Sequence, residues 1–426
     1  MDGFLTVGHP AAVAAVHAML TSRVPHAILI SGPGSVGKVA LALDLAAGLL
    51  CTGASGGDRP CRTCRTCRMV EHGNHPDLHW LGPEGAGNEV RIGGEQGKAR
   101  GVRDLVTELS LLPVEGGGRV AIVRDVHRAG EDAQSALLKT LEEPLRDTTV
   151  ILCADDEEVL LPTIRSRCAR IRLGMVGVRD VERLLVERGL SDAPTAARLA
   201  RLTGGRAGLA VSYASADGAE AIRGELTRTL LDLLDLGPSR RLAAAKPLLS
   251  RAMELDALLS PVTVIEAAPG RRGGVKGLPG AGAARSASGN PSGPPGTAAA
   301  GVAVPARDAA ERTAEGTDGD ADEVPDDGGP RKTPAATRRR ALLLLLDAWR
   351  SLARDLAFAQ CGAQGSIRDV ILLEEIEAAA RDLPSGAPAE TLARLVRADE
   401  LIAGNVSPEL VLDVLLVRWP RRRRAA

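Results

Sequence analysis

HAILISGPGSVGKVALALDLAAGLL, residues 26–50, sets the architecture of the N-terminal part of the chain. A short apolar run comes first, a glycine-rich loop follows, and a second apolar segment closes the stretch. From Gly32 to Lys38 the spacing is G-x-x-x-x-G-K, that of a phosphate-binding loop. This order predicts a buried strand over 26–30, a loop able to cradle phosphate, and a helix over 39–50.

The composition is that of an ordinary globular protein. Of 426 residues, 44% are hydrophobic and 25% charged, while aromatic residues make up only 1%, which favours helices over an all-β architecture. The formal net charge of −1 gives no global attraction to DNA or to a membrane surface. The first residues lack the basic and apolar regions of a signal peptide, and the apolar run 341–346 is too short to span a bilayer. We expect a cytoplasmic protein without membrane contact.

Strands alternate with helices over the first part of the chain. RVAIV (119–123) and TTVILCA (148–154) have the composition of buried strands. Between them, residues 132–143 show helical periodicity, with Asp132 placed as an N-terminal cap. This alternation predicts an α/β domain with a parallel sheet over residues 1–174.

No convincing strand follows residue 175, and the remaining sequence is predicted to be helical. Two short amphipathic helices over 178–189 and 192–205 indicate a small helical domain at 175–216. A further helical region is expected over 217–426, interrupted by a disordered insertion at 269–338, which is rich in Gly, Ala, Ser and Pro and then acidic. Helical periodicity in this region covers 221–237 and 239–268, resumes at 338–360 and continues through 407–420.

Four cysteines follow the loop helix closely in the sequence: Cys51, Cys61, Cys64 and Cys67. Three of them form C-x-x-C-x-x-C, and four thiolates this close can enclose one tetrahedral Zn²⁺ in a closed, structural site. An iron–sulfur cluster and redox-active thiols are the alternatives. Three downstream histidines stay outside the site because four sulfurs already fill it: His72, His75 and His79. Cys153 and Cys168 lie in or beside strand patterns and are expected in the core.

The glycine-rich loop has the residues for holding an anion but departs from a metal-binding nucleotide site. Backbone N–H groups near Gly32, Gly34 and Gly37 can approach phosphate, and Lys38 can pair with its oxygens. Val39, however, stands where a Ser or Thr hydroxyl would bind Mg²⁺.

A second departure follows the strand at 120–123. An Asp–Glu pair is expected there to organise Mg²⁺ and the attacking water, but the chain has Arg124 and Asp125. The two losses together argue against ATP hydrolysis and put ATP·Mg²⁺ binding by this chain in doubt.

Several segments together resemble one protein family. SALLKTLEEP (135–144), LPTIRSRC (161–168), the four-cysteine insertion and the α/β order are similar to the bacterial AAA+ clamp-loader family of DNA polymerase III, over about residues 1–215. The resemblance implies a RecA-like AAA+ domain with a zinc module, a helical lid and a C-terminal helical collar. Val39 and Arg124 match the subunit type that keeps the fold while its own nucleotide site has decayed.

The resemblance also implies a function without catalysis by this chain. Arg167 of the S-R-C segment would reach a neighbouring subunit's ATP site as an arginine finger. The implied partners are tau/gamma and delta subunits, with which the chain would load the sliding clamp onto primer–template DNA as part of the polymerase holoenzyme, a nucleotidyltransferase complex. The alternative for Arg167 is a local ion pair with Asp155 or Asp156.

Two other functions remain as alternatives: an active tau/gamma-type ATPase, and a zinc-dependent nucleic-acid-binding module. Arg206, in TGGRAGLA, is interpreted as a surface arginine at a helix start rather than a nucleotide sensor. Lys98, Arg100 and Arg103 form a basic cluster that either touches duplex phosphates or faces solvent.

Overall fold

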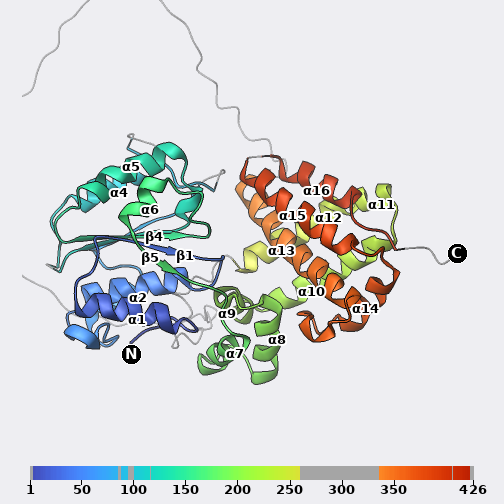
Figure 1. Cartoon of the computed structure of the whole chain (residues 1–426), viewed down its shortest axis with the longest axis horizontal. Coiled ribbons are helices and arrows are strands. Elements are labelled where there is room, and N and C mark those ends of the chain that lie inside the picture. The colour runs from blue at the N-terminus through green and yellow to red at the C-terminus, as the bar shows by residue number, and fades with distance from the viewer. Residues whose placement is uncertain are drawn as a thin grey trace, which may run out of the picture. The chain divides into compact units, whose positions relative to one another are not determined.

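The computed structural model describes residues 3–84, 88–94, 100–115, 117–259, 335–404 and 406–422 (Figure 1). The predicted disordered insertion at 269–338 lies outside these residues except for its last four positions. Those positions already belong to a helix that begins at Ala335, so the predicted boundary is too late. Within the described ranges, no helix is long and apolar enough to cross a membrane.

A five-stranded parallel sheet forms the centre of the N-terminal domain. Its strands run in the order β2-β3-β4-β1-β5. Their bounds are β1 Ala27–Ser31, β2 Leu78–Leu81, β3 Arg119–Val123, β4 Thr148–Ala154 and β5 Ala169–Arg172. The predictions for β3 and β4 are confirmed to the residue, and β1 is shifted by one. The edge strands β2 and β5 were not predicted, because their partly exposed residues form no continuous apolar run.

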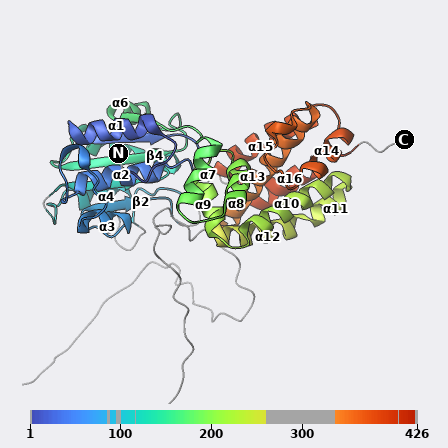
Figure 2. The same cartoon turned by 90° about the horizontal axis from the view of Figure 1, so that it is seen from below.

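Helices cover both faces of this sheet (Figures 1 and 2). One layer consists of α1 Pro10–Thr21, α2 Lys38–Leu50 and α3 Arg65–Glu71. The other consists of α4 Val102–Leu109, α5 Glu131–Glu142 and α6 Pro162–Arg167. Ile28 and Ile30 of β1 pack in the first core, whereas Ala27 and Leu29 pack in the second. Successive side chains of a strand point to opposite faces, so one apolar run supplies both cores.

The N-terminus of α5 corrects one detail of the sequence prediction. Gly130 is the N-cap, so Asp132 lies inside the first helical turn and does not cap the helix. There its carboxylate still interacts favourably with the positive end of the helix dipole.

All other described regular structure is helical, as the sequence predicted. The small group contains α7 Val178–Glu187, α8 Ala193–Thr203 and α9 Ala207–Ser215, of which only the start at Arg206 was predicted. The C-terminal group contains α10 Ala219–Asp232, α11 Pro238–Ala243, α12 Ala245–Leu259, α13 Ala335–Gln360, α14 Leu373–Asp382, α15 Ala387–Ala403 and α16 Pro408–Val417. Short 3₁₀ turns lie at η1 Gly56–Asp58, η2 Val126–Arg128, η3 Leu233–Asp235 and η4 Gln364–Ser366. The predicted fold class, a parallel α/β domain followed by helical regions, is confirmed.

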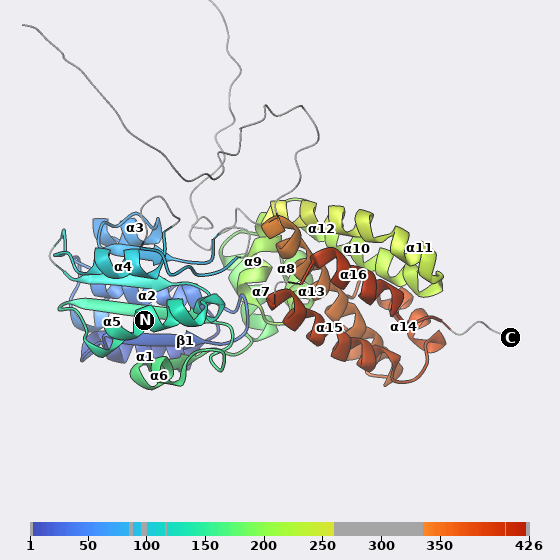
Figure 3. The same cartoon turned by 90° about the horizontal axis from the view of Figure 1, so that it is seen from above.

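Two helices that are distant in sequence pack side by side in the C-terminal group. α12 and α13 lie together although residues 260–334 separate them (Figure 3). Arg340 Nη2 of α13 lies 3.1 Å from Asp256 Oδ2 of α12, near the end of one helix and the start of the other. Trp349 of α13 is fully buried and meets Trp419 edge-on, with ring centroids 5.1 Å apart. The two sides of the intervening sequence thus share one apolar core.

This packing yields a deletion prediction. Replacing residues 271–332 with a short Gly/Ser linker should leave the melting temperature within a few degrees of the full chain, because the α12–α13 contact is retained and flexible loops cost little. Scanning calorimetry measures the effect, and Trp349→Ala is the positive control, expected to cost about 3–5 kcal/mol. Loss of cooperative unfolding in the deletion variant would contradict the prediction.

Candidate nucleotide and metal sites

The glycine-rich loop joins β1 to α2 in the predicted strand–loop–helix order. Three of its residues have left-handed backbone conformations: Gly32 at φ 142°, Ser35 at 61° and Gly37 at 110°. At Gly32 a side chain is excluded, because a Cβ there would lie 2.1 Å from the carbonyl oxygen of Leu173. Gly37 is the N-cap of α2, so the loop leads into a helix N-terminus, the arrangement that binds phosphate.

Lys38 begins α2 with its side chain only 5% exposed. Its Nζ donates hydrogen bonds to the carbonyl oxygens of Gly32 at 2.8 Å and Pro33 at 2.7 Å. It also lies 2.6 Å from Asp155 Oδ1. The other carboxylate oxygen of Asp155 lies against the loop, 3.2 Å from where a Cβ on Gly34 would be. Lys38 is thus held within the protein by two hydrogen bonds and one ion pair.

The two departures from a metal-binding site can be followed in the fold. Val39 packs against the apolar core between the sheet and α1–α3. Arg124 follows β3, and its guanidinium lies against Gly82, with Nη2 3.1 Å from where a Cβ on that glycine would be. Its Nε is buried without a hydrogen-bond partner. Mg²⁺ takes oxygen ligands, and neither Val39 nor Arg124 has a side-chain oxygen to offer.

A group that sequence reasoning missed lies beside the loop. Lys38, Asp125 and Asp155 line a cavity of about 670 Å³. His127 joins the two carboxylates, and one ligand atom from each of the three residues lies within 4.8 Å of the others. The Nδ1 of His127 accepts the backbone N–H of Asp155 at 3.1 Å. A neutral imidazole that accepts at Nδ1 carries its proton on Nε2, so in this form it has no lone pair left for a metal.

The protonation of His127 follows from its surroundings. Burial lowers the pKa of its imidazole, against the opposing effect of Asp155 and Asp125. The neutral ring is therefore the favoured form near neutral pH. The only sequence signal for this group was that two strands end beside it, since Asp125 follows β3 and Asp155 follows β4.

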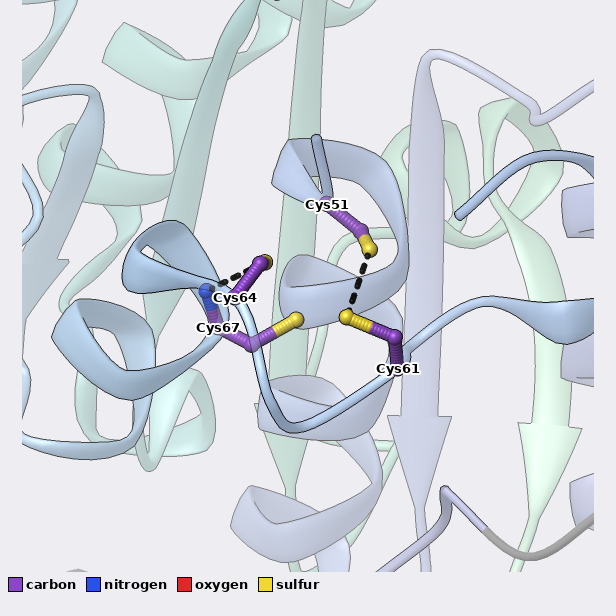
Figure 4. A group of neighbouring side chains, drawn as sticks. All are labelled: Cys51, Cys61, Cys64 and Cys67. Atoms are coloured by element: carbon purple, nitrogen blue, oxygen red, sulfur yellow. Dashed lines mark hydrogen bonds between the residues drawn. The ribbon is translucent and has the colours of Figure 1, made fainter. Parts of the chain in front are cut away.

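The four predicted cysteines do come together (Figure 4). Cys51 follows α2, Cys61 lies in the connecting loop, Cys64 is the N-cap of α3 and Cys67 lies in its first turn. Their sulfurs all lie within 4.8 Å of one another, close to the spacing of about 3.8 Å that four 2.3 Å Zn–S bonds require. Gly53 is needed beside them, because a Cβ there would lie 2.7 Å from Cys64 Cβ. The cluster is able to hold a metal ion.

The protein itself favours ionisation of two of these sulfurs. Burial disfavours the Cys64 thiolate, but the Thr66 hydroxyl and the Cys67 N–H donate to its Sγ, and its pKa falls to about 5. The Thr63 side chain lowers the pKa of Cys61 in the same way. Burial raises the pKa of Cys67. Since the thiolate is the metal-binding form, part of the ligand set is prepared by hydrogen bonding.

The other candidate ligands lie elsewhere, as predicted. Cys153 and Cys168 are buried in the cores of the sheet domain, and burial raises their thiol pKa values to about 12 and about 11. His79 Nε2 accepts a hydrogen bond from Arg119 Nη1 at 2.8 Å, and its Nδ1 donates to Glu108 Oε2 at 2.9 Å. Within the described residues, the cluster contains only the four sulfurs.

Arg167 is the last residue of α6, and its side chain is 35% exposed. Its Nη2 lies 2.7 Å from Glu142 Oε1, and its Nη1 donates to the Thr163 carbonyl at 3.0 Å. The alternative of an ion pair with a carboxylate is therefore present in the structure, but the partner is Glu142 rather than Asp155 or Asp156. α5 and α6 pack together on the same face of the sheet, which brings the end of α5 to this arginine.

Arg206 begins α9 as predicted, but the expectation of a surface residue is wrong. Its two terminal nitrogens donate to both carboxylate oxygens of Asp347 on α13, at 2.6 and 2.7 Å. The paired side chains are only 21% and 19% exposed. This bidentate pair links the small helical group to α13.

The predicted basic cluster is only partly available for phosphate contacts. Lys98 lies outside the described residues. Arg100 donates to both carboxylate oxygens of Glu108 and is neutralised there. Arg103 is exposed. Of the described residues in this cluster, it alone faces solvent without an ion pair to Glu108.

The family model and the curated relatives match the N-terminal part of the chain. The family model described as "DNA polymerase III, delta subunit" matches residues 8–176. DNA polymerase III subunit delta' of Pseudomonas aeruginosa is 36% identical over 187 residues, 42% of this chain and 53% of that protein. The Bacillus subtilis delta' subunit is 34% identical over 177 residues, 42% and 50% of the two chains. The Escherichia coli tau subunit is 32% identical over 183 residues, 42% of this chain and 26% of that protein.

Among solved structures, a gamma subunit-related protein of Thermotoga maritima is similar at 20% identity with a TM-score of 0.33, over 59% of this chain and 78% of that one. The Bacillus subtilis clamp loader delta protein is similar at 11% identity with a TM-score of 0.29, over 96% and 99%. The chain spans about half the length of the delta' relatives that it matches. Over residues 8–176, the chain is therefore similar to the delta' and tau subunits of DNA polymerase III.

Proposed function

We propose that the chain acts as a delta' subunit in a bacterial clamp loader. In this role it hydrolyses no ATP, assembles with tau/gamma and delta subunits, and supplies Arg167 in trans to the ATP site of a tau/gamma neighbour. The complex loads the sliding clamp onto primer–template DNA. The observation that carries the proposal is the combination, in one domain, of a nucleotide loop without its Mg²⁺ ligands and an accessible arginine at the end of α6.

The loss of ATPase activity is supported by the chemistry of the pocket. ATP is hydrolysed as its Mg²⁺ complex, and the metal neutralises charge as the phosphoryl group transfers. Val39 presents hydrocarbon to the core where an oxygen ligand is needed. Arg124 brings a fixed positive charge to the second position, which repels a divalent cation.

The role of Arg167 is supported by the weakness of the ion pair that holds its side chain. A partly exposed ion pair such as that with Glu142 is worth only about 0–1 kcal/mol. The guanidinium is therefore able to leave this carboxylate at little cost when a more negative phosphate group is near. An arginine on the transferring phosphoryl stabilises the charge of the transition state.

The proposed domain organisation follows the grouping of elements. The sheet and α1–α6 form the AAA+ domain at 1–174, α7–α9 form the lid at 175–216, and α10–α16 form the collar at 217–426 with the insertion at 269–338. In the assembled ring, the collar helices would contact tau/gamma and delta. For the N-terminal part of the chain, this assignment is supported by the similarity to subunits of DNA polymerase III.

The finger role is tested in a complex reconstituted with tau/gamma and delta. Arg167→Ala should leave assembly intact and reduce ATP turnover at the site that it serves, with about 10³–10⁵ as the range known for arginine fingers. Steady-state ATPase and clamp-loading assays measure the loss. Arg165→Ala is the matched control, because Arg165 lies on the same helix and pairs with Glu158. Unchanged turnover in a fully assembled complex would refute the role of Arg167.

The inactive site is tested on the chain alone. With ATP and Mg²⁺, turnover should be negligible for the wild type and equally negligible for Lys38→Ala. Turnover that disappears in Lys38→Ala would instead identify an active tau/gamma-type ATPase.

We also propose that the four-cysteine cluster holds a structural zinc ion. The observed sulfur spacing and the lowered thiol pKa values of Cys61 and Cys64 support this choice, and a closed four-sulfur site leaves no position open for catalysis. Purified protein should contain about one zinc ion per chain. Cys64→Ser should lower the zinc content and the melting temperature together, because metal binding contributes to folding.

Elemental analysis and calorimetry provide the readouts for the zinc proposal. Cys361→Ser is the matched control, since Cys361 is exposed and lies outside the cluster. Iron in place of zinc, or full stability after complete metal removal, would contradict a structural zinc site. DNA binding by the isolated chain that vanishes with zinc would favour the nucleic-acid-binding alternative.

A further inference from the structure

We propose that the Asp155 carboxylate occupies the anion site of the glycine-rich loop and thereby excludes phosphate ligands. The excluded ligands are inorganic phosphate, pyrophosphate and the phosphate chains of nucleotides. This inference rests on the proposed inactive site and deepens it, because it names the group that takes the place of the nucleotide.

Topology fixes the carboxylate beside the loop. β1 and β4 are neighbouring parallel strands, and Ser31 at the end of β1 pairs with Ala154 at the end of β4. The loop then continues from Gly32, whose N–H donates to the Ala154 carbonyl at 3.2 Å. Asp155 is the next residue, so the strand pairing places its side chain at the entrance of the loop without any adjustment of the helices.

The positive charge of Lys38 is already paired with groups of the protein itself. Its Nζ donates hydrogen bonds to the carbonyl oxygens of Gly32 and Pro33, at 2.8 and 2.7 Å, and forms an ion pair with Asp155 Oδ1 at 2.6 Å. The Lys38 side chain is almost fully buried, and these partners compensate for the hydration that its charge has lost. A phosphate that approaches the ammonium must therefore displace the Asp155 carboxylate from this ion pair.

The second oxygen of Asp155 adds a direct obstacle. It lies against the backbone at Gly34, in the part of the loop whose N–H groups would face a phosphate. An incoming phosphate meets this negative charge at short range, and like charges in a partly buried site disfavour each other strongly. The side chain is 40% exposed, so solvent screening weakens but does not remove the repulsion.

The backbone of the loop is otherwise intact. Gly32, Ser35 and Gly37 keep left-handed conformations, and the N-terminus of α2 follows directly. Removal of the Asp155 charge is therefore expected to restore affinity for phosphate rather than merely to disturb the fold. A loop that had lost its phosphate-binding conformation would not regain affinity in this way, so the result distinguishes that case from a loop blocked by Asp155.

The test uses the full chain and inorganic pyrophosphate without Mg²⁺, measured by isothermal titration calorimetry. Asp155→Ala should bind pyrophosphate at least about tenfold more tightly than the wild type. Asp155→Asn should gain less, because its amide oxygen still accepts from Lys38 while the charge is gone. Asp156→Ala is the matched control: it removes the same charge one residue away, from a side chain that accepts from Glu158 N, and should bind like the wild type.

Three outcomes would overturn the proposal: wild-type binding as tight as that of Asp155→Ala, no gain in either Asp155 variant, or an equal gain in Asp156→Ala. The isosteric Asn variant keeps the test decisive if the Ala variant fails to fold. Adding Lys38→Met to Asp155→Ala should abolish the gained affinity. None of these results depends on ATP turnover by the complex, so failure here is distinguishable from failure of the proposed clamp-loader role.

Discussion

The carboxyl edge of the parallel sheet is the constraint on which the site depends. β3, β4 and β1 are consecutive in the sheet, so their C-terminal ends meet at one edge. The hydrogen bond from Gly32 N to the Ala154 carbonyl joins the start of the loop to the end of β4. This pairing gathers Lys38, Asp125 and Asp155 around one cavity. Each comes from a different segment, and strand order alone determines that they meet.

How far the fold follows from sequence depends on how completely a strand is buried. β3 and β4 are buried almost throughout and are covered on both faces, so their sequences are continuous apolar runs that can be recognised directly. β2 and β5 lie at the sheet edges, where two of four and three of four residues are partly exposed or exposed. Their identity as strands comes from pairing with β3 and β1, which no local pattern encodes.

In the candidate sites, too, local features could be predicted from the sequence, whereas contacts between distant segments could not. Local spacing located the cysteine cluster, because its ligands lie within one short segment. The loss of oxygen ligands at Val39 and Arg124 was also visible from motif positions. The charge pairs were not predictable, since Arg206 and Asp347 are separated by 141 residues. Glu142 likewise reaches Arg167 only because α5 and α6 pack together, a tertiary contact with no sequence period.

The retained motif has a structural use that is independent of nucleotide. The loop connects the sheet to α9, because the N–H of Gly208 donates to the Ser35 carbonyl at 2.7 Å. A side chain at Gly208 would make a tight contact there, since its Cβ would lie 3.0 Å from that oxygen. Lys38 is a buried cation whose removal would leave the carbonyls of Gly32 and Pro33 without their donor and Asp155 without its ion-pair partner. Packing and charge balance are therefore enough to favour the G-x-x-x-x-G-K spacing after the Mg²⁺ ligands are gone.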